Sequence, residues 1–304
     1  MSVDGTLDAI VANCLTHLTA NAPCVRANSD PEGLHQMRVA IRRLRSALKL
    51  FKTLLPGVRY LALDGELKWL AGMLGEARDL DVLLAEVLPL ARAAIGDEEA
   101  FAVLEDRAVR RRAAVYRRVA AVLGSDRYAA LTNEVGRWRA EKTWRAAEDE
   151  REAKIFDESL GRVARRLLEK AHRRTMNRGR RFRKLDPAGR HRVRIAVKRL
   201  RYATDFFGGL YGRKSNKSYY DVLKRLQDDL GRANDVTTSE RLLLRLVGRD
   251  PDAGLKGGAQ ALLEWQRRDV LARDLSLIEK WRAFKRTTPF WVDRDARGKR
   301  RAKP

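Results

Sequence analysis

Basic side chains recur at intervals of three and four residues in LHQMRVAIRRLRSALKLF, residues 34–51. At about 100° per residue, a helix would collect them on one narrow face about 21 Å long, with apolar residues opposite. Arginine donates paired hydrogen bonds to phosphate oxygens, and lysine adds positive charge. The spacing therefore predicts a site for an extended, phosphate-like anion. We call this set the first stripe: His35, Arg38, Arg42, Arg45 and Lys49.

The same pattern returns 156 residues further along the chain. Residues 30–51, DPEGLHQMRVAIRRLRSALKLF, match residues 186–207, DPAGRHRVRIAVKRLRYATDFF, at 11 of 22 positions. Unrelated sequences would match at about one position in twenty, so the similarity indicates an internal repeat. Asp205 stands where the first stripe has its last lysine. The other repeated positions form the second stripe: His191, Arg194, Lys198 and Arg201.

A second motif repeats at the same shift. LKWLAGMLGEARD, residues 67–79, lies over LKRLQDDLGRAND, residues 223–235. We expect the repeated lysines to extend the anion site. We expect the repeated aspartates to pair with stripe arginines and to fix their direction. These pairs are Lys68 with Lys224 and Asp79 with Asp235.

A single cationic helix face is most often solvated surface, but its recurrence in one register favours a ligand. Positive neighbours lower the pKa of a histidine, and a bound polyanion raises it again. His35 and His191 therefore predict that anion binding tightens as the pH falls through neutrality. A structural role for both histidines, as capping residues in the first turn of their helices, stays open.

The rest of the chain also has helical periodicity, few strand signals and many good helix formers. It predicts an all-α fold of two four-helix bundles, residues 1–150 and 151–304, related by duplication about a pseudo-two-fold axis. Such an axis would bring both stripes to one groove or pore. In the first half we expect helices at residues 6–27, 34–51, 60–95 (bent near Gly72 and Gly75), 97–123 and 126–144.

The composition favours a polyanionic partner, since the net charge is +24 and the isoelectric point is about 10.7. The chain has neither a cationic leader before an apolar core nor a run of 18 apolar residues, so we expect a cytoplasmic protein that does not enter membranes. Cys14 and Cys24 have no metal-ligand spacing, and we expect them to be reduced.

No motif argues for catalysis or for a cofactor. The sequence lacks a Gly-rich phosphate loop ending in GK[ST], a nucleophile arrangement and a zinc-type cluster. Glu150, Glu152 and Lys154 match the alternating pattern with which triphosphate tunnel enzymes hold metal, but that chemistry needs a strand and the surroundings are helical. A divalent-metal site at Asp79 and Asp81 is a weak alternative, because the second copy has threonine in place of Asp81.

HQMRVAIRRLRSALKLF and HRVRIAVKRLRYATDFF resemble the signature of CHAD domains, the conserved histidine α-helical domain family, and LGEARDLDV resembles its second motif. The resemblance covers essentially the whole chain. It implies two four-helix bundles that bind inorganic polyphosphate through a basic central pore or surface, with location at polyphosphate granules. It assigns binding to both stripes, although Asp205 departs from the basic pattern. Many relatives carry a tunnel triphosphatase domain before this region, and here we expect a stand-alone member.

Together these features predict a non-catalytic polyphosphate-binding protein whose affinity falls steeply with salt. A nucleic-acid-binding helical protein is the second hypothesis. Its charge fits, but the first stripe holds no aromatic residue for base stacking and no helix-turn-helix pattern is visible. A phosphotransfer bundle that uses His35 and His191 ranks last, because the adjacent Gln36 and Arg192 offer no consistent partner for the proton.

Overall fold

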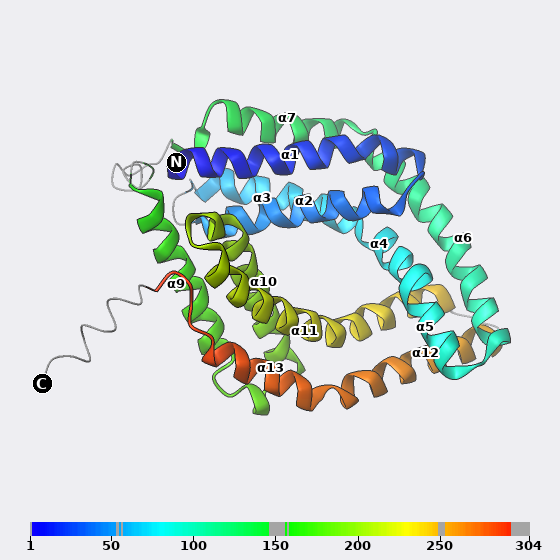
Figure 1. Cartoon of the computed structure of the whole chain (residues 1–304). Coiled ribbons are helices and arrows are strands. Elements are labelled where there is room, and N and C mark those ends of the chain that lie inside the picture. The colour runs from blue at the N-terminus through cyan, green and yellow to red at the C-terminus, as the bar shows by residue number, and fades with distance from the viewer. Residues whose placement is uncertain are drawn as a thin grey trace, which may run out of the picture. The chain divides into compact units, whose positions relative to one another are not determined.

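The computed structural model describes residues 2–52, 55, 57–145, 156, 158–248 and 253–292. All regular elements in these ranges are helices, which confirms the all-α fold class (Figure 1). None of the described helices is both long and apolar enough to cross a membrane. The predicted boundary near residue 150 and the Glu150–Lys154 pattern lie outside the described residues, as do residues 294–304, which the sequence predicts to be a basic C-terminal tail.

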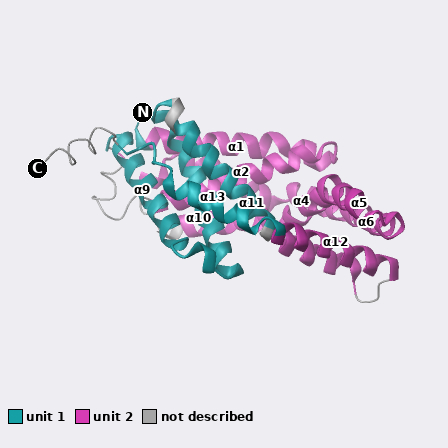
Figure 2. Ribbon diagram, turned by 60° about the horizontal axis from the view of Figure 1, so that its bottom comes forward, with its two compact units in different colours: residues 1–3, 158–233, 272–304 teal, residues 4–157, 234–271 magenta. Residues whose placement is uncertain are grey.

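Contacts within the chain define two compact units (Figure 2). Unit 1 comprises residues 1–3, 158–233 and 272–304, and unit 2 comprises residues 4–157 and 234–271. These units differ from the predicted halves, because residues 234–271 group with the N-terminal half of the chain. The division into two four-helix bundles by duplication stays a prediction.

Unit 2 holds the first stripe. Its elements are almost all of α1 (Val3–Ala27), α2 (Pro31–Leu50), α3 (Gly57–Met73), α4 (Gly75–Val82), a π-helical turn (Leu83–Val87), α5 (Leu88–Ile95), α6 (Glu98–Leu123), α7 (Asp126–Ala140), a 3-10 helix (Thr143–Arg145) and α12 (Ala253–Ala272). The helix α11 (Arg213–Val247) contributes its residues up to 233 to unit 1 and the remainder to unit 2.

The helix predicted over residues 60–95 is divided in the structure. It breaks at Leu74, between the two glycines where we expected a bend. The π-helical turn before α5 was not predicted. Pro89 lies in the first turn of α5 and has no N–H to donate to the preceding turn, so a local widening of the helix is expected there. The predicted segment at residues 126–144 ends as α-helix at Ala140.

Helix α2 is fixed by its start and by its apolar face. Asp30 caps it by accepting a hydrogen bond from the backbone N–H of Glu32 at 2.8 Å, and Pro31 suits the first helical turn. Met37 and Leu44 are buried on the side that packs against α3 and α4. Burial of this face leaves the stripe residues along the partly exposed side.

Unit 1 holds the second stripe and contains α9 (Leu160–Arg178), a 3-10 helix (Phe182–Lys184), α10 (Pro187–Phe207), a second 3-10 helix (Gly208–Leu210), the first part of α11, and α13 (Asp274–Arg286). Asp186 caps α10 through the N–H of Gly189 at 2.6 Å, as Asp30 caps α2. Residues 156 positions apart are buried alike: Met37 with Val193, Leu44 with Leu200, and Phe51 with Phe207.

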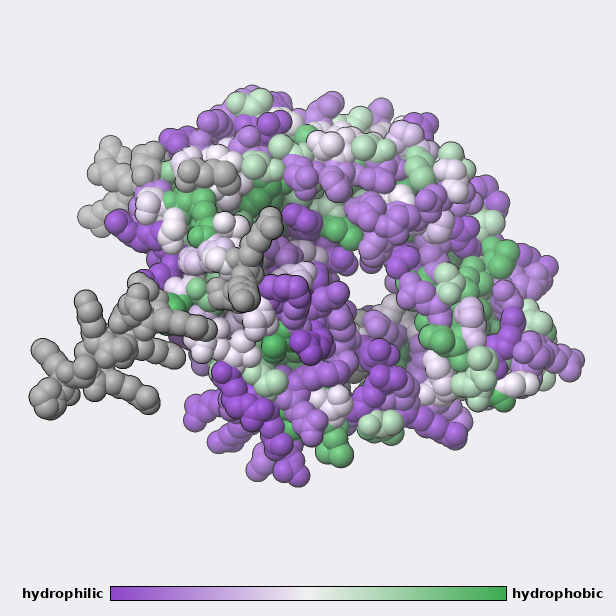
Figure 3. All heavy atoms as spheres, in the orientation of Figure 1, coloured by the Kyte–Doolittle hydropathy of each residue, from purple (hydrophilic) through white to green (hydrophobic). Residues whose placement is uncertain are grey.

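The outer surface is mostly hydrophilic on the face drawn in Figure 3, where apolar residues form separate small patches. This agrees with a chain in which charged residues make up 34% of the sequence. The functional question is therefore which of these charged side chains are neutralised by neighbours and which remain for a ligand.

Candidate anion-binding site

The first stripe lies on α2 as predicted, and all five of its side chains are partly exposed. Arg38 is the most anchored of them, because its Nη1 donates to the carbonyl oxygen of Ala71 on α3 at 3.1 Å. Burial lowers the pKa of the Arg38 guanidinium, and the nearby Asp79 carboxylate opposes that shift. Arginine retains its proton under such conditions, so α2 presents a fixed positive charge at the α3–α4 junction.

Four basic side chains gather around the N-terminal half of α2. Burial lowers the pKa of His35, and the charge of Arg78 on α4 lowers it further. Glu32 opposes this shift, whereas Arg42 and Arg38 add to it. A lowered histidine pKa means that the surroundings disfavour one more positive charge. We call this set the His35 cluster: His35, Arg38, Arg42 and Arg78.

Asp79 lies beside this cluster. Burial raises the pKa of its carboxyl group, while the charges of Arg38 and Arg245 lower it. Arg245 belongs to the part of α11 in unit 2, so three helices contribute charge around Asp79. The carboxylate is placed to balance part of the positive charge from Arg38 and Arg245.

The C-terminal end of the first stripe has a different partner, Asp64 on α3. Its carboxylate accepts a hydrogen bond from Arg45 Nε at 2.8 Å and lies 3.6 Å from Lys49 Nζ. Although burial would raise the pKa of Asp64, the hydrogen bond from Arg45 and the charge of Lys49 hold it below its ordinary value. Two of the five stripe cations are therefore already paired with an anion of the protein.

The second stripe lies on α10, with His191 exposed and the other three side chains partly exposed. At its end, Arg201 Nη1 donates to the hydroxyl of Tyr220 at 3.4 Å. Tyr220 is the 156-residue counterpart of Asp64, just as Arg201 is the counterpart of Arg45. The same pair of positions is in contact in both units, with a neutral phenol in place of the carboxylate.

The remaining predicted residues lie in different surroundings. Lys68 and Lys224 are exposed on α3 and α11. Asp235 is exposed and belongs to unit 2, whereas the α10 stripe belongs to unit 1. Asp81 is buried and accepts hydrogen bonds from Arg112 Nε at 2.6 Å and from Tyr116 Oη at 2.7 Å. Within the described ranges, no group of three or more His, Cys, Asp or Glu side chains is arranged for a metal ion.

Sequence reasoning missed Asp64, Tyr220, Arg78 and Arg245. Asp64 is not repeated at the 156-residue shift, because its counterpart is a tyrosine, so the internal repeat gave no signal for it. Arg78 is not repeated either, because its counterpart is Asn234. It nevertheless lies in the motif LGEARD, which also contains Asp79. The influence of the Arg245 charge on Asp79 follows from the course of α11, which no local pattern reveals.

A comparison with protein-family models identifies the family of this chain. Residues 9–244 match the model of the CHAD domain, and this region contains both stripes, Asp79 and Asp235. The chain belongs to the CHAD domain family. The resemblance read from the two stripe sequences is thereby confirmed.

Solved structures extend the CHAD match to nearly the whole chain. The crystal structure of the CHAD domain from the plant Ricinus communis is 34% identical, covers 95% of this chain and 93% of that one, and has a TM-score of 0.80. PptA from Streptomyces chartreusis is 17% identical and covers 93% of this chain and 100% of that one, with a TM-score of 0.65, which is a likeness of fold alone. A comparison with curated proteins gave no match.

Proposed function

We propose that this CHAD protein binds inorganic polyphosphate through its two stripes and does not hydrolyse it. CHAD domains are a polyphosphate-binding family. The observation that carries the proposal is the His35 cluster, where three arginines around one histidine concentrate positive charge on a partly buried face. A linear polyanion can follow such a face, and its phosphates replace their counterions by arginine, lysine and histidine.

The experiment is a competition titration against labelled long-chain polyphosphate at physiological salt. Pyrophosphate, duplex DNA and single-stranded DNA are expected to displace it only at much higher concentration, because neither a short anion nor a widely spaced phosphate backbone satisfies the whole stripe. Displacement by DNA at the same concentration as by polyphosphate would contradict the proposal. Incubation with polyphosphate and Mg²⁺ is expected to release no phosphate, and release would reveal an enzyme.

Asp64 is expected to limit affinity, because it holds Arg45 and Lys49. Replacing Asp64 by asparagine removes the carboxylate that competes with the ligand for Arg45 and Lys49, so we expect polyphosphate affinity to rise about 3- to 10-fold, a gain of roughly 1 kcal/mol. The slope of affinity against salt concentration should also become steeper, since more phosphate contacts form. Isothermal titration at several salt concentrations measures both.

Glu66→Gln is the matched control for Asp64→Asn. Glu66 lies two residues away on the same helix, carries the same charge, and pairs with Arg127 rather than with the stripe. An equal rise in affinity for both variants would show a general charge effect and would contradict the specific role of Asp64.

Polyphosphate binding by the His35 cluster is expected to tighten at lower pH. Burial and the neighbouring arginines lower the pKa of His35 in the free protein below its ordinary value of 6.5. A bound polyanion raises that pKa, so binding takes up a proton and strengthens as the pH falls through the interval between the two values. The interval therefore begins below pH 6.5. Measuring polyphosphate affinity between pH 5 and 8 should show this increase, and His35→Gln should make the affinity nearly independent of pH. If the variant keeps the pH dependence of the unaltered chain, a group other than His35 takes up the proton.

We also propose a cytoplasmic setting at polyphosphate granules. A fluorescent fusion of the full chain should coincide with stained granules, and a fusion with altered stripes should not. Diffuse fluorescence of the unaltered fusion in granule-containing cells would contradict this part of the proposal.

A further inference from the structure

The most strongly charged segment of the chain is neither stripe. Residues 161–184 contain eleven lysines and arginines and a single acidic residue, Glu169, so they carry +10 of the net charge of +24. The segment comprises nearly all of α9 and the 3-10 helix that follows it, both in unit 1. No residue of the first or the second stripe lies within this segment.

Helix α9 separates these charges from its apolar residues. Val163, Leu167 and Leu168 are buried, and α9 packs extensively against α10. The basic side chains lie on the exposed side, at spacings of three and four residues over about 18 Å. We call them the α9 face: Arg162, Arg165, Arg166, Lys170, Arg173 and Arg174.

Most of the α9 face lacks an acidic partner among the residues that the structure describes. Arg166 lies 3.4 Å from Glu158, which is the single ion pair made by this face within the described part of the chain. Glu169 accepts a hydrogen bond from Trp291 Nε1 at 3.0 Å. The remaining arginines and lysine therefore have their charge available to an external anion, unlike Arg45 and Lys49 of the first stripe.

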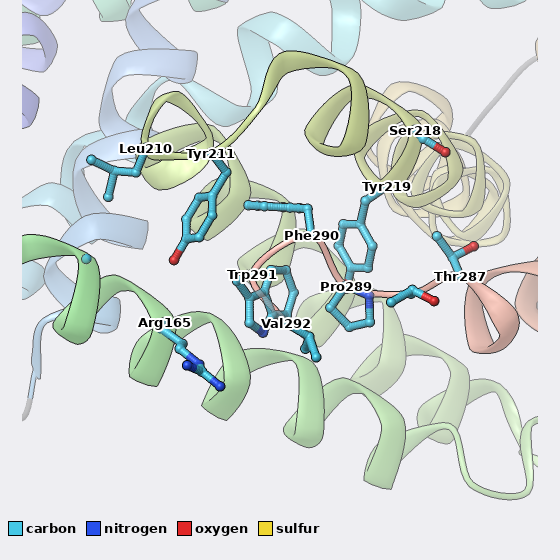
Figure 4. Close-up of a pocket in the computed structure, with 12 residues that line it drawn as sticks. Arg165, Leu210, Tyr211, Ser218, Tyr219, Thr287, Pro289, Phe290, Trp291 and Val292 are labelled. Carbon is cyan, nitrogen blue, oxygen red and sulfur yellow. The ribbon is translucent and has the colours of Figure 1, made fainter. Parts of the chain in front are cut away.

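A pocket of about 790 Å³ adjoins the α9 face (Figure 4). Arg165 belongs both to the face and to the pocket wall, which also includes Tyr211, Phe290 and Trp291. The rings of Tyr211 and Phe290 are partly exposed and meet edge to face, with centroids 5.0 Å apart. The pocket therefore combines aromatic ring surface with one arginine.

The deeper rings of the pocket have no polar group left to offer. The hydroxyl of Tyr219 lies 2.9 Å from His172 Nδ1, and the indole N–H of Trp291 is held by Glu169. Both side chains are buried. These two side chains present apolar, aromatic surface, which suits a flat ring more than it suits a phosphate, while Ser218, Thr287 and Thr288 add hydroxyl groups to the wall.

We propose that the α9 face and this pocket bind single-stranded nucleic acid. Its phosphates lie along the exposed arginines of α9, and one base enters the pocket against Tyr211 and Phe290. Base–aromatic stacking beside a positively charged track is the general means of holding single strands without sequence preference. The surface is separate from the stripes and does not depend on their ligand.

Other polyanions fit this surface less well. Polyphosphate has no planar group to fill an aromatic pocket, and the bases of a duplex are stacked inside it. An anionic membrane calls for exposed apolar residues beside the charges, whereas the apolar residues of α9 are buried against α10. A single strand uses both the charge and the rings.

The test measures binding of a labelled fifteen-nucleotide oligo(dT) to the full chain by fluorescence anisotropy. Arg165→Glu, Lys170→Glu and Arg173→Glu in one variant are expected to lower the affinity at least about 30-fold, because three phosphate contacts become repulsive. The matched control reverses two other exposed arginines and a lysine in unit 2, none with an ion pair in the described structure: Arg26, Arg117 and Lys256. It should change the affinity less than about 3-fold.

The pocket is tested by a ring deletion. Tyr211→Ala should weaken oligo(dT) binding roughly 5- to 100-fold, the effect of losing one stacked base, whereas Tyr211→Phe should keep most of the affinity. An abasic strand of equal length should bind the unaltered chain as weakly as oligo(dT) binds the alanine variant. Unchanged polyphosphate binding and circular dichroism would show that the variants are folded.

Two results would overturn the proposal. One is equal affinity for the abasic strand and oligo(dT), which would leave the pocket without a role. The other is stronger binding of phosphatidylserine vesicles than of oligo(dT), lost in the α9 variant, which would identify a membrane surface.

Discussion

Reversing Arg42 and Lys198 to glutamate in one variant is expected to weaken long-chain polyphosphate binding by at least about 100-fold. The two residues occupy equivalent positions of the two stripes and are partly exposed. A charge-assisted hydrogen bond is worth about 1.5–3 kcal/mol, and reversal adds repulsion to its loss. The slope of affinity against salt should fall by about 0.7–0.9 for each phosphate contact removed, by analogy with nucleic acids. Titration at several salt concentrations measures both quantities.

The control for this variant is Arg26→Glu with Lys256→Glu, which makes the same change of charge at exposed positions outside the stripes. It should lower affinity less than about 3-fold. Arg42→Gln with Lys198→Gln provides a milder version with less risk to folding, checked by circular dichroism. Equal losses in the stripe variant and its control would reduce the proposal to general charge attraction.

The single variants test whether one polyphosphate chain engages both stripes. If it does, binding at the second stripe is intramolecular, and long chains gain about 10²- to 10⁴-fold over chains that reach one stripe. Arg42→Glu alone should then remove most of the advantage of long chains over short ones. If the two stripes bind separate polyphosphate chains, each single variant should instead halve the number of binding sites and leave the affinity of the unaltered stripe unchanged.

Arg45 and Arg201 provide an internal comparison within the same helices. Arg45 is held by the Asp64 carboxylate and Arg201 by the Tyr220 hydroxyl. Replacing Arg45 by alanine should therefore weaken polyphosphate binding less than replacing Arg201, because a carboxylate neutralises Arg45 whereas the partner of Arg201 is a neutral phenol. The contribution of each stripe residue depends on its protein partner as well as on its position along the helix.

Local signals predicted the helices well. Asp30 with Pro31 and the apolar residues that follow set the start and the buried face of α2, and Asp97 marked the start of α6 by accepting from the N–H of Ala100. Helix caps and apolar faces depend on residues within one or two turns of each other, so they can be recognised from a short stretch of sequence. The all-α class followed for the same reason.

Partners far apart in the sequence could not be predicted in this way. Asp64 is 19 residues from Arg45, and only the packing of α3 against α2 brings them together. Arg245 acts on Asp79 because residues 234–271 group with the N-terminal half of the chain, which the repeat argued against. The sequence predicts the positions of the stripe residues. It does not predict which of their charges are neutralised by acidic residues of the protein.

Replacing Asp81 by alanine is expected to lower the free energy of unfolding by about 2–4 kcal/mol. The buried carboxylate holds α4 to α6 through Arg112 and the Tyr116 hydroxyl, and the Arg112 guanidinium lies 4.2 Å from the centre of the Tyr116 ring. Without Asp81, a buried hydroxyl and a guanidinium that is mostly shielded from solvent lose their acceptor, and such groups are costly to leave unpaired. Urea unfolding followed by circular dichroism measures the loss.

The control for Asp81→Ala is Glu66→Gln, because both carboxylate oxygens of Glu66 also accept hydrogen bonds, here from Arg127, but the pair is about half exposed. Solvent screens that pair, so its loss should cost less than about 1 kcal/mol. Asp81→Ala should also weaken polyphosphate binding, because α4 carries Arg78 of the His35 cluster and a loosened α4 would no longer hold Arg78 in place. A variant that lost stability while retaining full affinity would separate the α4–α6 contact from the binding site, and Arg78 would then be dispensable for the ligand.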